Sequence, residues 1–271
     1  MPDNNLFFAL SNASPGRDDA FNEWYDRHHI REVPEFYLGF MIGRRYRLAP
    51  VQRTGDGAGT PCPWEYLAIY QLDPAIAVAD VHASVASPAE RTVSAGDTLS
   101  PDHVAWTWQP IGPRVVASGA SAAAGAQQHV LLALTNPAAG RDDEFNAWYD
   151  TRHLPEAVQG IRGRVAAQRY RLTEAQRPDQ WDAAVPGRPA RAGEPRDGQW
   201  LPWRYLALYE LEGDDVAELQ ASDAAVRAAG DLSPAGELID PFFAVWLFSA
   251  LPDPSWQAPA PGTAAAGVIA T

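Results

Sequence analysis

Residues 16–26 read GRDDAFNEWYD, and residues 140–150 read GRDDEFNAWYD. Nine of these eleven positions are identical, at an offset of 124 residues. The similarity continues upstream, where 6–12 aligns with 130–136, and downstream, where Arg45-Tyr46-Arg47-Leu48 aligns with Arg169-Tyr170-Arg171-Leu172. An ordered series of matches at one offset predicts that the chain contains two copies of one module.

The offset then increases to 139, because 64–70 aligns with 203–209. The 15 additional residues lie in 173–202, which is rich in Pro, Gly, Arg and Asp and is expected to form a long loop, with Trp181 and Trp200, that closes over a pocket as a lid. We therefore predict a first module, a linker of small residues, a second module and a Pro/Ala-rich tail, at 1–111, 112–128, 129–251 and 252–271.

Within one module, periodicity and turn residues predict two helices and four strands. Helical spacing of Phe21, Trp24, Tyr25 and His28 indicates a helix over 17–33. In the second copy, Pro155 is expected to mark the end of the corresponding helix. The remaining segments are a second helix over 75–86 and strands over 6–12, 40–48, 64–72 and 103–111.

This order, β-α-β-β-α-β, is the split ferredoxin-like pattern, in which both helices cover one face of an antiparallel sheet. The other face must be buried elsewhere, and two such faces in one chain can bury each other at roughly 25 cal/mol per Å² of apolar surface. We therefore expect an α+β fold in which two tandem modules form a single-chain pseudo-dimeric barrel.

The pattern Phe-Asn-x-Trp-Tyr-Asp-x-x-His, followed by Glu and by Arg-Tyr, resembles the dimeric α/β-barrel superfamily, and within it the EthD-like branch. The resemblance covers roughly 6–111 and 130–249. It implies a pocket between the sheet and the helices of each module. Proteins of this superfamily include cofactor-free monooxygenases, cyclases, decarboxylases, isomerases and haem enzymes. The resemblance therefore implies one fold but does not select one reaction.

Overall composition excludes several classes of partner. The net charge of −13 and the absence of a basic run disfavour nucleic acid. The sequence contains no apolar run of about 18–20 residues, so no membrane partner is expected. Cys62 is the single cysteine, which excludes an intrachain disulfide, and the polar N-terminus does not resemble a signal peptide, so a cytoplasmic location is expected.

Both copies place Asn, Asp and His at i, i+4 and i+7 on one helical face, as Asn22, Asp26 and His29 do. An Asp three residues before a His can orient the imidazole, and an imidazole is a suitable general acid or base near neutral pH. The predicted catalytic residues are His29, His153, Asp26, Asp150, Tyr25 and Tyr149. The predicted substrate-binding residues are His28, Asn22, Asn146, Arg45, Arg169, Tyr46, Tyr170, Trp24, Trp148 and His82.

The same residues also have structural interpretations. Either histidine can tie a helix end to the sheet, Arg45 and Arg169 can pair with nearby carboxylates, and Trp24 and Trp148 have the size of core residues. The copies differ in that His28 becomes Arg152 and His82 aligns with Gln220, which makes copy one the richer in histidine.

We therefore expect a cofactor-independent enzyme, of lyase, isomerase or cyclase type, that uses histidine acid–base catalysis on a small apolar substrate, aromatic or carbonyl-bearing. No metal site is expected, because Cys/His clusters and the H-E-x-x-H motif are absent from the sequence. The alternatives are a haem-dependent enzyme on the same fold and a non-catalytic small-molecule-binding or stress-response module. Either a monomer or a homodimer is compatible with internal pairing of the modules.

Overall fold

The structure is a computed structural model, and it describes residues 4–86, 94–120, 128–176, 195–196, 199–200 and 202–252. Most of the long loop predicted over 173–202, with Trp181, lies outside these residues, as do the side chain of Trp200 and nearly all of the predicted tail. The lid role of that loop therefore stays a prediction.

Each module has the predicted β-α-β-β-α-β order. The first consists of β1 (Leu6–Ser11), α1 (Asp18–Trp24), α2 (Ile30–Phe36), β2 (Phe40–Leu48), β3 (Tyr66–Leu72), α3 (Val78–Ala86) and β4 (Val104–Val116). The second consists of β5 (His129–Thr135), α4 (Asp142–Trp148), α5 (Leu154–Gly160), β6 (Arg164–Leu172), β9 (Tyr205–Leu211), α6 (Val216–Ala229) and β10 (Ala244–Ala250). A two-stranded hairpin, β7 (Pro195–Arg196) with β8 (Gln199–Trp200), lies between β6 and β9.

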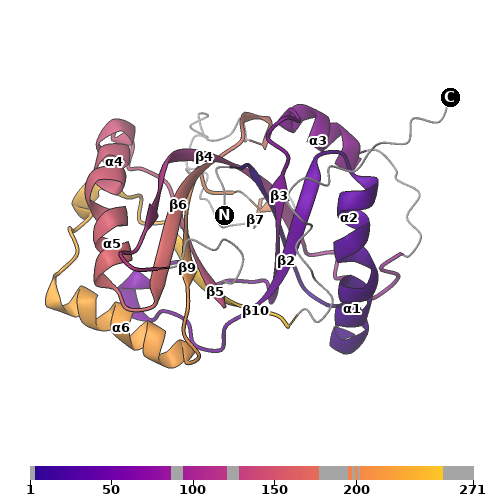
Figure 1. Cartoon of the computed structure of the whole chain (residues 1–271), viewed down its shortest axis with the longest axis horizontal. Coiled ribbons are helices and arrows are strands. Elements are labelled where there is room, and N and C mark those ends of the chain that lie inside the picture. Colours follow the sequence, from indigo (N-terminus) through magenta and orange to yellow (C-terminus); the bar gives the residue numbers. More distant parts are fainter. Residues whose placement is uncertain are drawn as a thin grey trace.

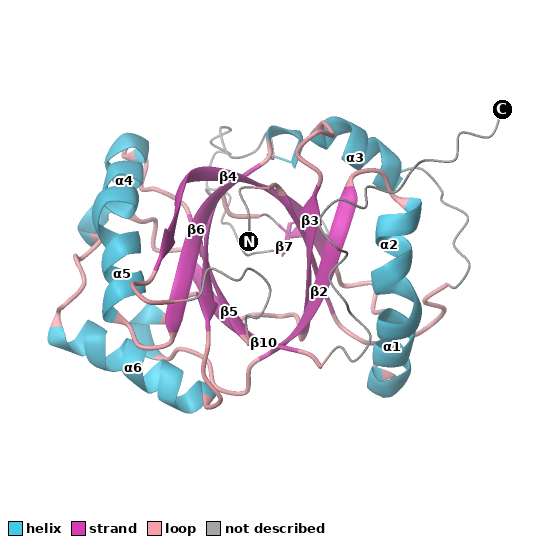
Figure 2. Cartoon of the chain, viewed as in Figure 1, coloured by secondary structure: helices cyan, strands magenta, loops and turns pink. Residues whose placement is uncertain are grey.

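The eight long strands close into one antiparallel barrel in the order β1-β3-β2-β10-β5-β9-β6-β4 (Figure 1). The two modules are joined where β4 pairs with β6 and where β2 pairs with β10. In Figure 2 the helices lie on two opposite sides of the barrel, α1, α2 and α3 of the first module on one side and α4, α5 and α6 of the second on the other. The predicted α+β fold with two tandem modules in one pseudo-dimeric barrel is confirmed.

The boundary of the first module differs from the expected one. The small residues from 112 onward were expected to form a linker, but β4 continues through them to Val116. Val115 and Val116 pair with Ala167 and Ala166 of β6, after a register shift that follows Ile111. The additional pairing satisfies backbone hydrogen-bonding groups that a free linker would expose, so the segment adds length to the seam between the modules.

Four tryptophans meet inside the barrel, two from each module. Neighbouring ring centroids are 5.8 Å apart for Trp64 and Trp106, 6.3 Å for Trp106 and Trp203, 5.5 Å for Trp203 and Trp246, and 5.8 Å for Trp246 and Trp64. All four contacts are edge-to-face, the geometry that the ring quadrupole favours, and each contributes about 0.5–1.5 kcal/mol beyond area burial. This ring therefore locks the two bare sheet surfaces together.

Between the two α-helical segments at the start of each module, the chain widens into one π-helical turn, at Tyr25–His29 and Tyr149–His153. Pro155 follows the second of these turns and occupies the start of α5. The prediction that Pro155 ends the helix is therefore wrong. Pro155 stands where the π-helical turn gives way to α-helix, so its missing N–H falls at an interruption of the regular α-helical hydrogen-bond pattern.

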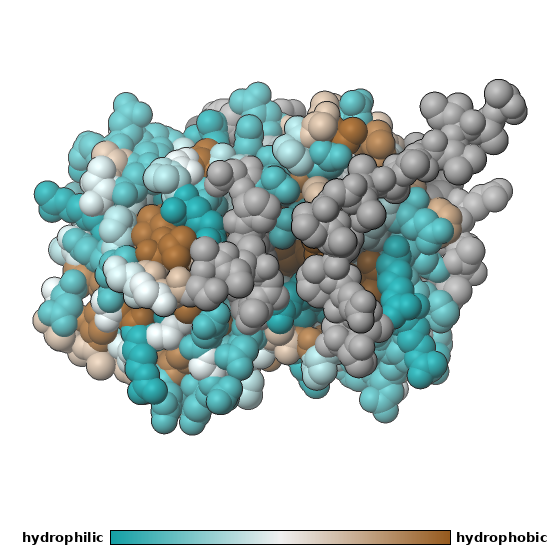
Figure 3. All heavy atoms as spheres, viewed as in Figure 1, coloured by the Kyte–Doolittle hydropathy of each residue, from teal (hydrophilic) through white to brown (hydrophobic). Residues whose placement is uncertain are grey.

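The helices are amphipathic, with apolar faces that pack on the outer surface of the sheet around Phe21 and Val33 in the first module and Phe145 and Val158 in the second. Their outward faces are largely hydrophilic in the view of Figure 3. In the described part of the chain, every helix is too short or too polar to cross a bilayer.

Candidate functional site

A cavity lies between the helices and the outer face of the sheet in each module. The first cavity, lined among others by Phe7, Trp24 and Tyr70, has a volume of about 180 Å³. The second cavity, lined among others by Leu131, Trp148 and Tyr209, has a volume of about 660 Å³. Because the repeat relates Phe7, Trp24 and Tyr70 to Leu131, Trp148 and Tyr209, the two cavities occupy equivalent places in the two modules.

The π-helical turns bring a histidine and a tryptophan of the same helix face to face. The imidazole of His29 stacks on the indole of Trp24, with ring centroids 4.6 Å apart, and His153 stacks on Trp148 at 4.5 Å. Single π turns inside α-helices occur frequently at functional sites. Both predicted histidines line their cavities, as do both predicted tyrosines at the start of the turns.

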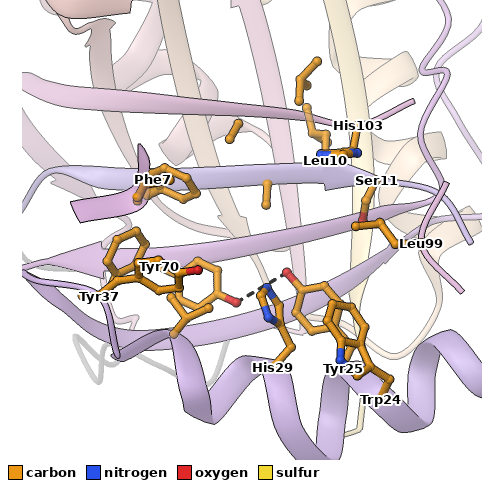
Figure 4. A pocket seen from close by; sticks show the side chains of 16 residues that line it. Phe7, Leu10, Ser11, Trp24, Tyr25, His29, Tyr37, Tyr70, Leu99 and His103 are labelled. Carbon is orange, nitrogen blue, oxygen red and sulfur yellow. Dashed lines mark hydrogen bonds between the residues drawn. The ribbon is translucent and has the colours of Figure 1, made fainter. Parts of the chain in front are cut away.

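In the first cavity, hydroxyl and imidazole groups gather around an apolar space. The hydroxyls of Tyr25 and Tyr70 lie 3.4 Å apart, and His29 lies against the edge of the Tyr25 ring with centroids 4.8 Å apart (Figure 4). His103, which precedes β4, lines the same cavity from another side. His103 was not among the predicted site residues, because the aligned residue of the second copy is Phe243 and the repeat therefore does not single out His103.

The second cavity contains arginines where the first is apolar. Arg53, Arg164 and Arg227 all line it. Their guanidinium groups converge on the carboxylate of Asp223, at 2.9 Å, 2.8 Å and 3.0 Å respectively. None of these four residues was among the predicted site residues. The one available signal for the cluster was that Arg164 aligns with the apolar Phe40.

The predicted aspartates bind arginine. Asp26 forms an ion pair with Arg45, and Arg45 also donates a hydrogen bond to Asn22 at 2.8 Å. The ring of Tyr25 lies under the same guanidinium, at 4.2 Å.

The second module repeats the arrangement, with Arg169 at 2.6 Å from both Asp150 and Asn146. The structural interpretation of both arginines therefore has direct support, because in each module the guanidinium group joins the first helix to the sheet. None of the two arginines, two aspartates and two asparagines is among the residues that line the two cavities.

Several predicted substrate-binding residues lie away from the cavities. Tyr46 and Tyr170 point into the barrel interior, because alternate residues of a strand face opposite sides of the sheet and their neighbours Arg45 and Arg169 face the helices. His82 on α3 forms a hydrogen bond with Thr107 at 2.8 Å, and His28 is half-buried on its helix. Neither of these histidines lines the first cavity.

Several ionisable side chains that line the second cavity have pKa values shifted from their ordinary ones. Burial, reinforced by the positive charges of Arg164, Arg227 and Arg53, lowers the pKa of His153 to about 3. His153 is therefore an uncharged imidazole at neutral pH. Its Nδ1 atom is buried without a hydrogen-bond partner among the described residues. Burial also raises the pKa of Tyr149 and of Tyr209, so both phenols are protonated donors.

Within the described ranges, no group of three or more His, Cys, Asp or Glu side chains has the arrangement of a metal site. Cys62 is half-buried, and its thiol donates to the carbonyl of Trp64 at 3.2 Å.

Comparisons with known proteins find similarity in fold. No protein-family model matches the chain, and no curated protein matches it. An anthrone oxidase-like protein superposes with a TM-score of 0.50 and 10% identity, covering 91% of this chain and 90% of its own. A mutant chlorite dismutase from Candidatus Nitrospira defluvii gives 0.49 and 10%, covering 92% and 91%. A haem-binding protein from Thermus thermophilus gives 0.41 and 9%, covering 93% of each chain. The chain therefore has the fold of the dimeric α/β-barrel proteins, with both halves of the barrel supplied by one polypeptide.

Proposed function

We propose that the chain is a cofactor-independent enzyme that moves a proton on a small apolar compound, aromatic or carbonyl-bearing, bound in the first cavity. The observation that carries the proposal is the meeting of His29 with the hydroxyls of Tyr25 and Tyr70 at one apolar cavity. A proton acceptor beside a pair of phenols is the donor and acceptor set that an enolisation requires.

In the proposed reaction, His29 transfers the proton and the two tyrosines stabilise the negative charge that develops. His29 takes the proton from the carbon next to the substrate carbonyl; the electron pair of the broken C–H bond forms a carbon–carbon double bond, and the π pair of the carbonyl group moves to its oxygen. Tyr25 and Tyr70 donate hydrogen bonds to that developing oxyanion. Return of the proton from His29 to another carbon completes an isomerisation, whereas return to the same carbon regenerates the substrate; either way the enzyme is left unchanged. Lyase and cyclase reactions share this first step.

The surroundings support the same role. Trp24 covers one face of the imidazole and so limits its orientation. Phe7 and Leu99 contribute apolar wall, which excludes water and strengthens the hydrogen bonds inside. Arg45 is a positioning residue, because it holds Asp26 and Asn22 of the helix that carries His29.

Size separates this proposal from a haem bound in the first cavity. The first cavity, at about 180 Å³, is smaller than the roughly 300–1,000 Å³ of drug-sized ligand pockets. A compound of one or two rings is therefore the expected substrate, and a haem does not fit this cavity. No step proposed here uses haem. A Soret band that appears on reconstitution with haem and is lost in His29→Gln would contradict this assignment.

Hydrogen–deuterium exchange provides a test that does not require the natural substrate. Acetophenone and 1-indanone lose their α-protons to D2O when enolised, and 1H NMR follows the loss. We expect the protein to accelerate exchange of at least one of them, His29→Gln to reduce that acceleration by about 10²-fold or more, and Tyr70→Phe to reduce it less.

His153→Gln is the matched control, since it makes the same change in the second module. It is expected to keep the wild-type exchange rate. Exchange that is no faster than in buffer, while both ketones bind, would instead favour the non-catalytic binding module. An unchanged rate in His29→Gln would show that the proton moves elsewhere.

A further inference from the structure

We infer that the second cavity is a binding site for an organic carboxylate, whose charged group is held by Arg53, Arg164 and Arg227. This site is separate from the proposed acid–base site, which lies in the other module.

The first observation is an excess of buried positive charge. The exposed side-chain fractions of Arg164, Arg53 and Arg227 are 2%, 10% and 36%, and that of Asp223 is 6%. Three guanidinium groups thus share one carboxylate. Asp240 also lines the cavity, but it accepts the amide hydrogen of Phe242 at 2.8 Å and forms no ion pair within the described residues. Even with Asp240 included, cations outnumber carboxylates, and buried cations without counterions are costly.

The second observation is unused hydrogen-bonding capacity. The Nε atoms of Arg53 and Arg164 are buried and lack a partner among the described residues, as does the hydroxyl of Tyr209. Guanidinium N–H groups in a fixed fork match the two oxygens of a carboxylate. An anionic ligand that reached these atoms would satisfy donors that the described residues leave unpaired.

The third observation is the shape and lining of the cavity. Its volume of about 660 Å³ lies within the range of sites for drug-sized ligands. Leu131, Ala133, Ile239 and Val245 form apolar wall in the same cavity. An inorganic anion would leave this wall unoccupied, whereas an organic acid places its carboxylate on the arginines and its apolar body against these side chains.

The first module serves as an internal comparison. Arg164 and Asp223 align with Phe40 and Val85, both of which line the first cavity. The charged cluster is therefore not a requirement of the fold. Arg53 belongs to the segment after β2 of the first module and reaches the second cavity, because pairing of β2 with β10 places that segment beside the other half. The site thus needs both modules.

Isothermal titration calorimetry with 2-naphthoate, 2-naphthamide and inorganic phosphate tests the inference. The acid and the amide share one ring system and differ in charge. We expect 2-naphthoate to bind at least ten-fold more tightly than 2-naphthamide, and more tightly than phosphate. Equal affinity for acid and amide, or absence of naphthoate binding, would overturn the inference. Phosphate binding as tight as naphthoate binding would also overturn it, in favour of an inorganic anion site.

Two variants locate the site. Arg164→Met removes the most buried cation, and Arg227→Gln removes the most exposed one, which makes the latter the safer change for folding. Each is expected to weaken naphthoate binding at least ten-fold and to leave naphthamide binding unchanged. Arg162→Gln is the control, because Arg162 is 80% exposed and lies outside the residues that line the cavity. It pairs at 3.5 Å with Glu218 of α6, the helix that also carries Arg227. Full naphthoate affinity in both Arg164→Met and Arg227→Gln would refute the assignment.

The outcome is independent of the proposed enzyme activity. His29→Gln should bind 2-naphthoate as the wild type does, whether or not the first cavity catalyses exchange. Loss of naphthoate binding in His29→Gln, with Arg164→Met unaffected, would place the carboxylate in the first cavity and contradict the inference.

Discussion

Phe40 and Arg164 occupy the first position of equivalent strands, β2 and β6, yet one is apolar and the other is charged. Phe40 pairs across the strand with Leu72 and Arg164 with the aligned Leu211. Each packs against the equivalent tyrosine: Phe40 lies 5.5 Å from Tyr70 between ring centroids, and the Arg164 guanidinium lies 4.2 Å from the centroid of Tyr209. One backbone position therefore gives the two cavities different chemistry.

Phe40→Arg is expected to destabilise the first module. Phe40 is 7% exposed, and the aligned partner of Asp223 is Val85, so the new guanidinium would be buried without a counterion. The free energy of unfolding, measured in urea, should fall by about 3 kcal/mol or more. Val85→Asp added to Phe40→Arg should recover part of this loss. A double variant no more stable than Phe40→Arg would show that the modules are not equivalent here.

Arg45→Met should weaken the attachment of the first helix. Arg45 is 5% exposed and is bonded to both Asp26 and Asn22, so the change removes charge-assisted hydrogen bonds of about 1.5–3 kcal/mol each. The net loss in the free energy of unfolding is smaller than their sum, because water can hydrogen-bond to the half-exposed Asp26 in the variant. Arg47→Met, which breaks the exposed pair with Glu65, should cost at most about 1 kcal/mol. Urea denaturation compares the two. Equal losses would argue against the fastening role of Arg45.

The buried imidazole of His153 makes stability depend on pH. Its pKa is about 3 in the folded protein, because of burial and then the three arginines, against about 6.5 in an unfolded chain. The unfolded state therefore binds the proton more tightly. The stabilisation of the folded state by the uncharged imidazole is fully present above about pH 6.5 and is lost progressively as the pH falls towards 3. Unfolding free energies measured at several pH values should fall less steeply in His153→Gln. A His153 NMR titration centred near pH 6.5 would disprove this.

Tyr46→Phe is expected to leave the unfolding free energy unchanged or to raise it by up to about 1 kcal/mol. The Tyr46 hydroxyl is buried in the barrel interior and has no hydrogen-bond partner among the described residues. Removing an unsatisfied polar atom avoids its desolvation penalty. Thermal unfolding measures the effect, with ketone exchange in the first cavity expected to stay at the wild-type rate. A marked loss of either would indicate that the hydroxyl is used.

The sequence by itself determined the duplication, the order of the helices and strands, and the bounds of most of them. These features follow from local periodicity and from the identical residues that the two copies share at aligned positions. The predicted strand 40–48 coincides with β2, and the two helix histidines that the repeat singles out both line cavities. Tertiary structure alone decided the extension of β4 to Val116 and the entry of His103 into the first cavity. It also brought Arg53, Arg164, Arg227 and Asp223 together. Contacts between residues so distant in sequence depend on closure of the barrel, and no local pattern of residues encodes them.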